Sequence, residues 1–170
     1  TVNDENVNSS FSREYTANTP ITIVAVDSAG NRTEQKVTIG MIDTTAPASP
    51  TLQYTTNVTG QVVLTVLNAY AAANPATVYS FETSKTLTLL PPPAEANGSP
   101  ETTVYRTEVV PTAAGTPVAY GAPVAAAVPL TLTAQNGADT PYSIQVQTTD
   151  GAGNVTTTEY RVTITVPKPA

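Results

Sequence analysis

The residues of this chain that could do chemistry are almost all carboxylates. Its 170 residues include 13 acidic and 7 basic side chains but no cysteine, histidine or tryptophan. A thiolate nucleophile, an imidazole base and a zinc site built from Cys or His are therefore excluded. Two carboxylates acting together, as in glycoside hydrolysis, remain the one available catalytic device. The acids are spread singly along the chain, so we expect no enzyme.

Two of these aspartates occupy the same place in a repeated motif. Asp27 lies in ValAspSerAlaGlyAsn at residues 26–31, and Asp150 lies in ThrAspGlyAlaGlyAsn at residues 149–154. In such a turn the Asp side chain accepts hydrogen bonds from backbone amides just ahead, Gly supplies a positive φ, and Asn tolerates one. The residues expected to make the turns are Asp27, Gly30, Asn31, Asp150, Gly153 and Asn154.

A bound calcium ion is the alternative use of these aspartates. Asp27 and Asp43, joined by Asp4 or Glu5, could meet at a junction between repeats, and Asp150 completes the set of candidates. Calcium takes six to eight oxygen ligands, and the spacing here matches no dedicated calcium loop. Turn formation explains the aspartates without a metal. We therefore expect no cofactor, with calcium as the alternative.

The sequence around the turns has the pattern of β-strands. Apolar residues alternate with Thr and other polar residues, and no stretch has a sustained helical period. Only 12% of residues are charged, and 15 Pro and 9 Gly fall mostly between the apolar runs, where they end strands. An all-β chain follows. The expected strands lie near residues 10–15, 21–26, 33–41, 51–54, 61–67, 77–81, 86–90, 102–110, 128–134, 142–148 and 156–166.

The two turns belong to a longer repeat. ThrProIleThrIle at 19–23 and ThrProTyrSerIle at 140–144 precede them, and the connector IleAspThrThrAlaPro follows the first copy at 42–47. The hairpins and connector resemble the tandem bacterial immunoglobulin-like repeats of cell-surface and S-layer-type proteins. This resemblance implies an immunoglobulin-like antiparallel β-sandwich with a Greek-key topology, and a location outside the cell at the bacterial surface. It hardly covers residues 85–128.

The repeat predicts an unequal domain organisation. Residues 1–42 are a partial repeat, 43–50 a linker, 51–166 a complete sandwich with long insertions at 91–100 and 113–129, and 167–170 a C-terminal linker. A piece of about 40 residues with two or three strands does not hold a core alone, so its apolar face needs a cover. Three alternatives remain: a cut end of a longer array, packing along the complete domain, or strand pairing with another copy. Because the chain starts at a Thr, we expect a processed chain or an excerpt.

Charge and hydropathy limit the partners. The net charge is −6 and the basic residues are scattered, so nucleic acid is not an expected partner. No run approaches the roughly 20 apolar residues of a membrane span. We expect a structural, non-catalytic segment of an exported bacterial surface assembly, such as an S-layer lattice, a filament or an adhesin stalk. Its partners would be other copies of itself or neighbouring repeats, joined through strand edges.

A binding module is the alternative from another functional class. As an adhesin or an accessory carbohydrate-binding domain, the chain would need exposed aromatic platforms. The candidates are Tyr70, Tyr79, Tyr105 and Tyr120. Three tyrosines on one face would favour ligand binding, and scattered tyrosines would count against it. A self-formed Lys–Asn bond is a further alternative, with Lys36 and Lys85 as candidates, although lysines on strands more simply protect sheet edges.

Overall fold

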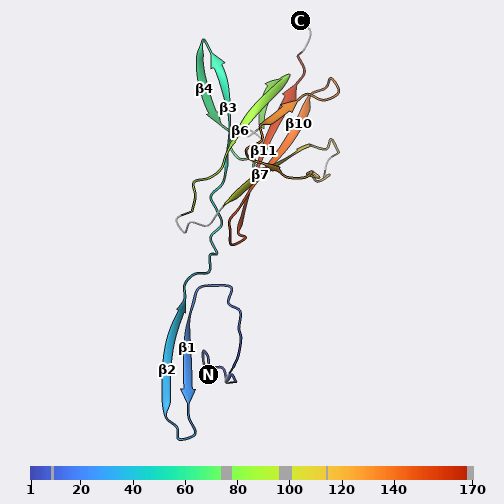
Figure 1. Cartoon of the computed structure of the whole chain (residues 1–170). Coiled ribbons are helices and arrows are strands. Elements are labelled where there is room, and N and C mark those ends of the chain that lie inside the picture. Colours follow the sequence, from blue (N-terminus) through green and yellow to red (C-terminus); the bar gives the residue numbers. More distant parts are fainter. Residues whose placement is uncertain (9, 74–77, 96–100, 114, 168–170) are drawn as a thin grey trace. The chain divides into compact units, whose positions relative to one another are not determined.

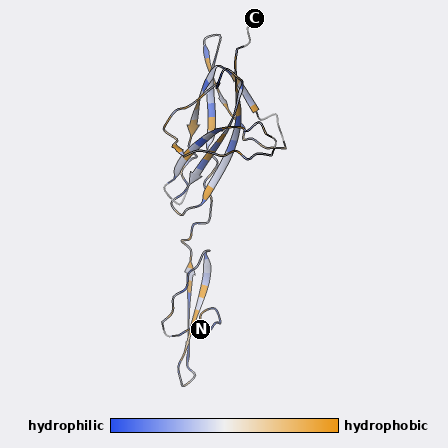
Figure 2. Cartoon of the chain, turned by 90° about the vertical axis from the view of Figure 1, so that its right-hand side faces the viewer, coloured by the Kyte–Doolittle hydropathy of each residue, from blue (hydrophilic) through white to orange (hydrophobic). Residues whose placement is uncertain are grey.

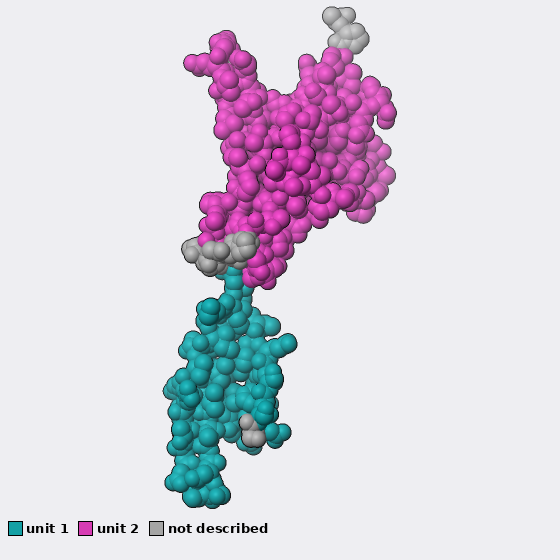
Figure 3. All heavy atoms as spheres, in the orientation of Figure 1, with its two compact units in different colours: residues 1–45 teal, residues 46–170 magenta. Residues whose placement is uncertain are grey.

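A computed structural model describes every residue except 9, 74–77, 96–100, 114 and 168–170 (Figure 1). Eleven β-strands and no helix occur in the described part of the chain, so the prediction of an all-β protein is confirmed. The chain divides into two compact units, Thr1–Thr45 and Ala46–Ala170, and their boundary falls in the expected linker (Figure 3). Part of the expected loop at 91–100 and most of the C-terminal linker lie outside the described residues.

The first unit is built on one antiparallel hairpin. Strand β1 (Thr19–Val26) pairs with β2 (Arg32–Ile39) from Thr19 opposite Ile39 to Val26 opposite Arg32. The start of the chain adds a short bridge beside β1. There the N–H of Val24 donates to the C=O of Thr1 (2.9 Å), and Val2 is buried opposite Ile23.

The strand expected at residues 10–15 is absent, and that prediction was wrong. Arg13 stands between Phe11 and Tyr15 and interrupts the apolar face that a strand would present. Its guanidinium instead forms an exposed ion pair with Glu5. A charged side chain at that position favours a surface loop over a strand with one buried face.

The second unit contains two sheets. The five-stranded sheet has the order β5-β11-β10-β7-β8 and the four-stranded sheet the order β4-β3-β6-β9; only β5 and β11 run parallel. The strands are β3 (Thr51–Val58), β4 (Gln61–Val66), β5 (Val78–Glu82), β6 (Ser84–Leu90), β7 (Thr102–Val109), β8 (Val124–Ala125), β9 (Leu130–Thr133), β10 (Thr140–Thr149) and β11 (Val155–Thr165).

One hydrophobic core joins the two sheets. Alternate side chains of β10 and β11 are buried, as a strand with one inward face requires. The buried residues from the five-stranded sheet are Tyr105, Tyr142, Ile144, Val146, Tyr160, Val162 and Ile164; those from the four-stranded sheet are Leu52, Leu87, Leu89, Leu130 and Leu132. Each fully buried aliphatic side chain contributes roughly 1.5–3 kcal/mol. The arrangement is that of a β-sandwich.

The β3–β4 hairpin reaches further than the sequence suggested. A two-residue turn at Thr59 and Gly60, both at positive φ (50° and 85°), lets β3 continue to Val58. Strand β6 pairs with β3 only from Thr51 to Gln53, so beyond this point β3 and β4 form a two-stranded ribbon (Figure 1). The two-residue strand β8 was also not expected; it lies inside the predicted insertion 113–129.

Candidate functional site

The two repeated turns are closed by the same hydrogen bonds. In the second unit, Asp150 Oδ1 accepts the backbone N–H of Ala152 and of Asn154, each at 2.9 Å, and Oδ2 accepts Asn154 Nδ2 at 2.9 Å. Gly153 follows at φ 93°. In the first unit, Asp27 Oδ1 accepts the backbone N–H of Ala29 (2.8 Å) and of Asn31 (2.9 Å), and Oδ2 accepts Asn31 Nδ2 (2.7 Å). Gly30 lies at φ 86°. The carboxylates organise backbone, as a turn residue does.

These hydrogen bonds change the acidity of both aspartates. The Asn31 side chain, helped by the backbone N–H groups of the turn, lowers the pKa of Asp27. Burial, the largest influence on Asp150, raises its pKa, but the hydrogen bonds from the Asn154 side chain and from the turn backbone together lower it below the ordinary value.

A pH dependence of stability follows for the second unit. Because the pKa of Asp150 is lower in the folded chain than the unfolded value of about 3.9, its carboxylate stabilises the fold above about pH 4. That contribution is lost as the pH falls through the folded pKa. We expect Asp150→Asn to lower the Tm at neutral pH, and the Tm difference from wild type to shrink towards pH 2. Thermal unfolding followed by circular dichroism tests this, and a difference constant with pH would contradict it.

The calcium candidates of the first unit do not come together. Asp27 lies in the turn at one end of the hairpin, and Asp43 lies beyond the other end of β2, where its Oδ1 accepts the N–H of Thr45 (3.1 Å). The eight residues of β2 span about 26 Å, far more than one coordination sphere. In the second unit, a carboxylate oxygen of Asp150 lies within 4.8 Å of one of Glu95.

Two of the four candidate tyrosines belong to the core. Tyr105 is buried, and its hydroxyl donates to the C=O of Pro129 (3.3 Å). Tyr79 packs against the core edge to face with Tyr54, at 6.3 Å between ring centroids, and its hydroxyl accepts the N–H of Asn68 (2.8 Å). Tyr105 is thus enclosed by the core, and Tyr79 is partly buried against it.

The other two tyrosines meet a polar network on the outer face of the five-stranded sheet. Tyr120 donates to Ser143 Oγ (2.5 Å), Ser143 Oγ donates to Glu159 Oε1 (2.8 Å), and Arg161 Nε contacts the same oxygen at 2.6 Å. The Arg161 guanidinium lies 4.8 Å from the centroid of the Tyr70 ring. Burial raises the pKa of Tyr120, so its hydroxyl remains a donor at neutral pH. Sequence reasoning missed Ser143, Glu159 and Arg161.

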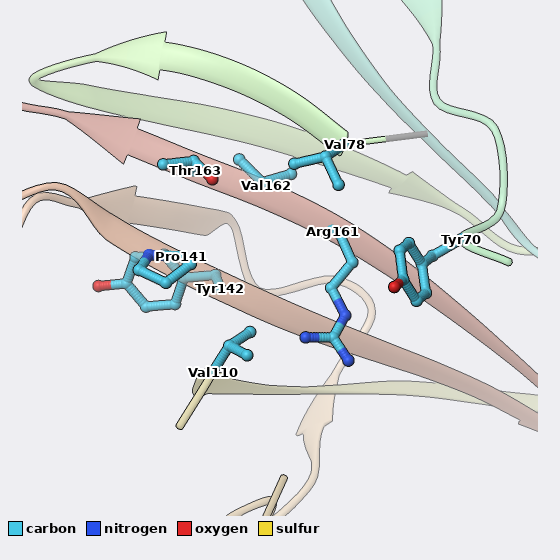
Figure 4. A pocket seen from close by; sticks show the side chains of 8 residues that line it. All are labelled: Tyr70, Val78, Val110, Pro141, Tyr142, Arg161, Val162 and Thr163. Carbon is cyan, nitrogen blue, oxygen red and sulfur yellow. The ribbon is translucent and has the colours of Figure 1, made fainter. Parts of the chain in front are cut away.

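A shallow hollow of about 140 Å³ lies beside this network (Figure 4). In the close view, the Tyr70 ring and the Arg161 guanidinium lie at one end, and Pro141 and Val110 lie towards the other. The hollow thus combines one aromatic face, one cation and an apolar floor. Such a set suits a small polar ligand, although ligand pockets usually measure about 300–1,000 Å³.

The lysine candidates have conventional roles. Lys85 Nζ donates to the C=O of Thr55 (2.8 Å) and lies 4.9 Å from the centroid of the Tyr54 ring. Lys36 Nζ lies 3.6 Å from Glu34 Oε1 on the first hairpin. Both lysines are held by neighbours of opposite charge or by π-systems.

The first hairpin carries an exposed apolar face. Four aliphatic side chains share one side of the β1–β2 pair, and Figure 2 shows orange apolar segments along both strands. Ile23 and Val37 are 38% and 41% exposed. We call Ile21, Ile23, Val37 and Ile39 the hairpin face. The opposite side carries the charged residues Arg32, Glu34 and Lys36 together with Val26.

The repeat shows what this face lacks. Aligned on the turn aspartates, Ile21 opposite Val37 corresponds to Ile144 opposite Tyr160 in the second unit, where both side chains are buried under the facing sheet. In the first unit, Val2, Val7 and Phe11 surround a hollow of about 430 Å³ beside the hairpin instead of filling it. The same hairpin is therefore covered in one copy and open in the other.

No known family model matches the sequence, and no curated protein matches it either. Across the described residues, no helix has both the length and the apolar character needed to cross a bilayer.

Proposed function

We propose that this chain is a structural, non-catalytic segment of an exported bacterial surface assembly, such as an S-layer lattice, an extracellular filament or an adhesin stalk. Its fold would be an immunoglobulin-like Greek-key sandwich preceded by a partial repeat. Other copies or neighbouring repeats would be its partners. The observation that supports this most directly is the open hairpin face, whose counterpart in the second unit is buried.

Burial of the exposed apolar area would favour such a contact. A two-stranded hairpin on its own is marginally stable in water. It becomes stable when further strands or another element cover its apolar face with apolar side chains. Exposed contiguous apolar surface on a folded protein marks an interaction site. A neighbouring copy that supplies this cover would form a head-to-tail contact. Repetition of such a contact builds a fibre or sheet unless the copies close into a ring.

The assembly state of the intact chain tests this proposal. We expect light scattering and electron microscopy to show fibres or sheets whose amount grows with concentration. Val37→Lys places a charge on the hairpin face and should abolish assembly, because burying an unpaired ammonium costs several kcal/mol. Thr38→Lys adds the same charge to the opposite side of β2 and should leave assembly intact. A wild-type chain that stays monomeric at high concentration would refute the proposal.

Ligand binding is the second candidate, as an adhesin or an accessory carbohydrate-binding module. The stacked Tyr70–Arg161 pair beside the 140 Å³ hollow favours it. The hollow has room for one sugar ring rather than an oligosaccharide. Titration of wild type and Tyr70→Ala with monosaccharides, followed by chemical shifts, should show saturable shifts that the variant loses. Identical spectra with and without sugar would remove this candidate.

A further inference from the structure

The strand β4 is unusual among the strands of the second unit because its aliphatic side chains face solvent. Val62, Leu64 and Val66 project from one side of the strand and are 73%, 55% and 52% exposed, and Val63 on the other side is 43% exposed. β4 ends its sheet, and no described strand pairs with its outer edge. The strand thus offers both an open hydrogen-bonding edge and an apolar stripe.

The ribbon formed by β3 and β4 has little support from the rest of the sheet. Beyond Gln53 its two strands pair only with each other in the described structure. A two-stranded ribbon is marginal in water, whereas three or more strands with a hydrophobic face are stable. A second ribbon added at the β4 edge would complete a four-stranded antiparallel sheet.

The edge strands β2, β5 and β9 carry features that prevent edge pairing. β2 bears Arg32, Glu34 and Lys36, with a 2.7 Å ion pair between the first two. β9 has four residues and buries both of its leucines, and β5 ends at Glu82. Charges and short length are the usual protection of a sheet edge. β4, with the sequence GlnValValLeuThrVal, has neither charge nor proline.

The charge distribution indicates that the partner is another copy of the same chain. No charged residue occurs from 44 to 81, although the whole chain has a net charge of −6. Two copies therefore repel each other over most of their surface and can approach without repulsion at the ribbon. Lys85, which reaches the ribbon from β6, lies over the Tyr54 ring, on the side opposite to Leu64.

We propose that two copies of the chain pair antiparallel through the outer edge of β4, in a register centred on Leu64. This register places Leu64 opposite Leu64 of the second copy and Val62 opposite its Val66. The three most exposed aliphatic side chains of each strand then form one continuous apolar stripe. Such a two-fold contact is self-complementary and closed, unlike the head-to-tail contact of the hairpin face. It does not depend on the function proposed above.

The predicted dimer is weak. Two six-residue edges bury less than the roughly 1,200 Å² of a standard interface, so we expect a dissociation constant on the order of 10–100 μM. Sedimentation of the Val37→Lys chain, in which assembly through the hairpin face is blocked, should show a monomer–dimer equilibrium in that range. A monomer at about 1 mM would overturn the proposal.

Single cysteines test the register in a chain that has none of its own. Directly opposed residues of antiparallel strands have Cα atoms about 4.5–5.5 Å apart, within disulfide range. Leu64→Cys should therefore form a dimer under mild oxidation. Two copies of Val62→Cys would place their thiols roughly 14 Å apart and should not crosslink, but Val62→Cys mixed with Val66→Cys should. Equal crosslinking at all positions, or none at 64, would overturn the register.

Variants with opposite charges at residue 64 distinguish the two-fold pairing of β4 strands from any other contact that β4 could make. In the Val37→Lys background, Leu64→Lys and Leu64→Glu, each alone, oppose like charges and should be monomeric. An equimolar mixture should dimerise again, because residue 64 then meets the opposite charge. The same Tm for both variants as for Val37→Lys alone shows that they fold. Failure of the mixture to dimerise would refute the two-fold pairing, whereas Val37→Lys, which tests the hairpin face, should leave this dimer unchanged.

Discussion

Ile144→Ala should destabilise the second unit by about 2–5 kcal/mol. Ile144 is fully buried on β10, between β7 and β11 and under the four-stranded sheet, so its truncation removes apolar contact and leaves a cavity. Chemical denaturation of the intact chain, followed through the tyrosine signal of the second unit, measures the change. A loss below about 1 kcal/mol would mean that the core is not packed as described.

The matched variant in the first unit is Ile21→Ala. The repeat gives Ile21 the same place on its hairpin, but its surroundings lack the facing sheet, and the side chain is only half-buried. In dilute solution we expect a cost of less than about 1 kcal/mol, because little apolar area is lost. If a neighbouring copy covers the hairpin face, Ile21→Ala should instead weaken assembly. Equal costs for the two variants in dilute monomer would contradict the open state of the first hairpin.

The second large effect is expected at Ser143. Its side chain is fully buried, and its Oγ accepts from Tyr120 and donates to Glu159. Ser143→Ala leaves a hydroxyl donor and a carboxylate without this partner, at a cost of about 1–3 kcal/mol. Denaturant unfolding of Ser143→Ala should show it.

Tyr120→Phe provides the control through a double-mutant cycle. If Tyr120 and Ser143 interact, the double variant should lose less stability than the sum of the single variants. Additive losses would show that residues near 120 are not held against the sheet. The interaction matters because it fixes the long connection between β7 and β8 on the outer face of the five-stranded sheet.

Much of the fold was predictable from local patterns. The alternation of Val, Ile and Thr gives the strands, and the AspXaaAlaGlyAsn sequence gives both hairpin turns, since each needs an Asp acceptor and a Gly at positive φ. The prediction of a strand at residues 10–15 was wrong because a strand needs a neighbouring strand edge to pair with as well as an alternation of apolar and polar residues. The ribbon beyond Gln53 was missed because the Thr59–Gly60 turn lacks the usual Asn-Gly or Asp-Gly pair.

The candidate site was less predictable, because it depends on pairing between distant residues. The turn at Asp150 fixes the register of β10 and β11 and so places Ser143 opposite Arg161, a signal that was present in the sequence. Tyr120 reaches the same network from a long connection, which no local rule positions. Tyrosine spacing also could not separate the buried Tyr105 from the half-buried Tyr70, because Tyr70 follows β4 outside any strand, where alternation gives no rule.

The most direct test of assembly through the hairpin face is hydrogen exchange at the backbone amides of β1 and β2 in the intact chain, measured at low and at high protein concentration. We expect fast exchange in dilute solution and strong protection when the chain is concentrated, because a neighbouring copy then covers the hairpin face. Protection that is the same at both concentrations would contradict it, since the face would then be either always covered or never covered.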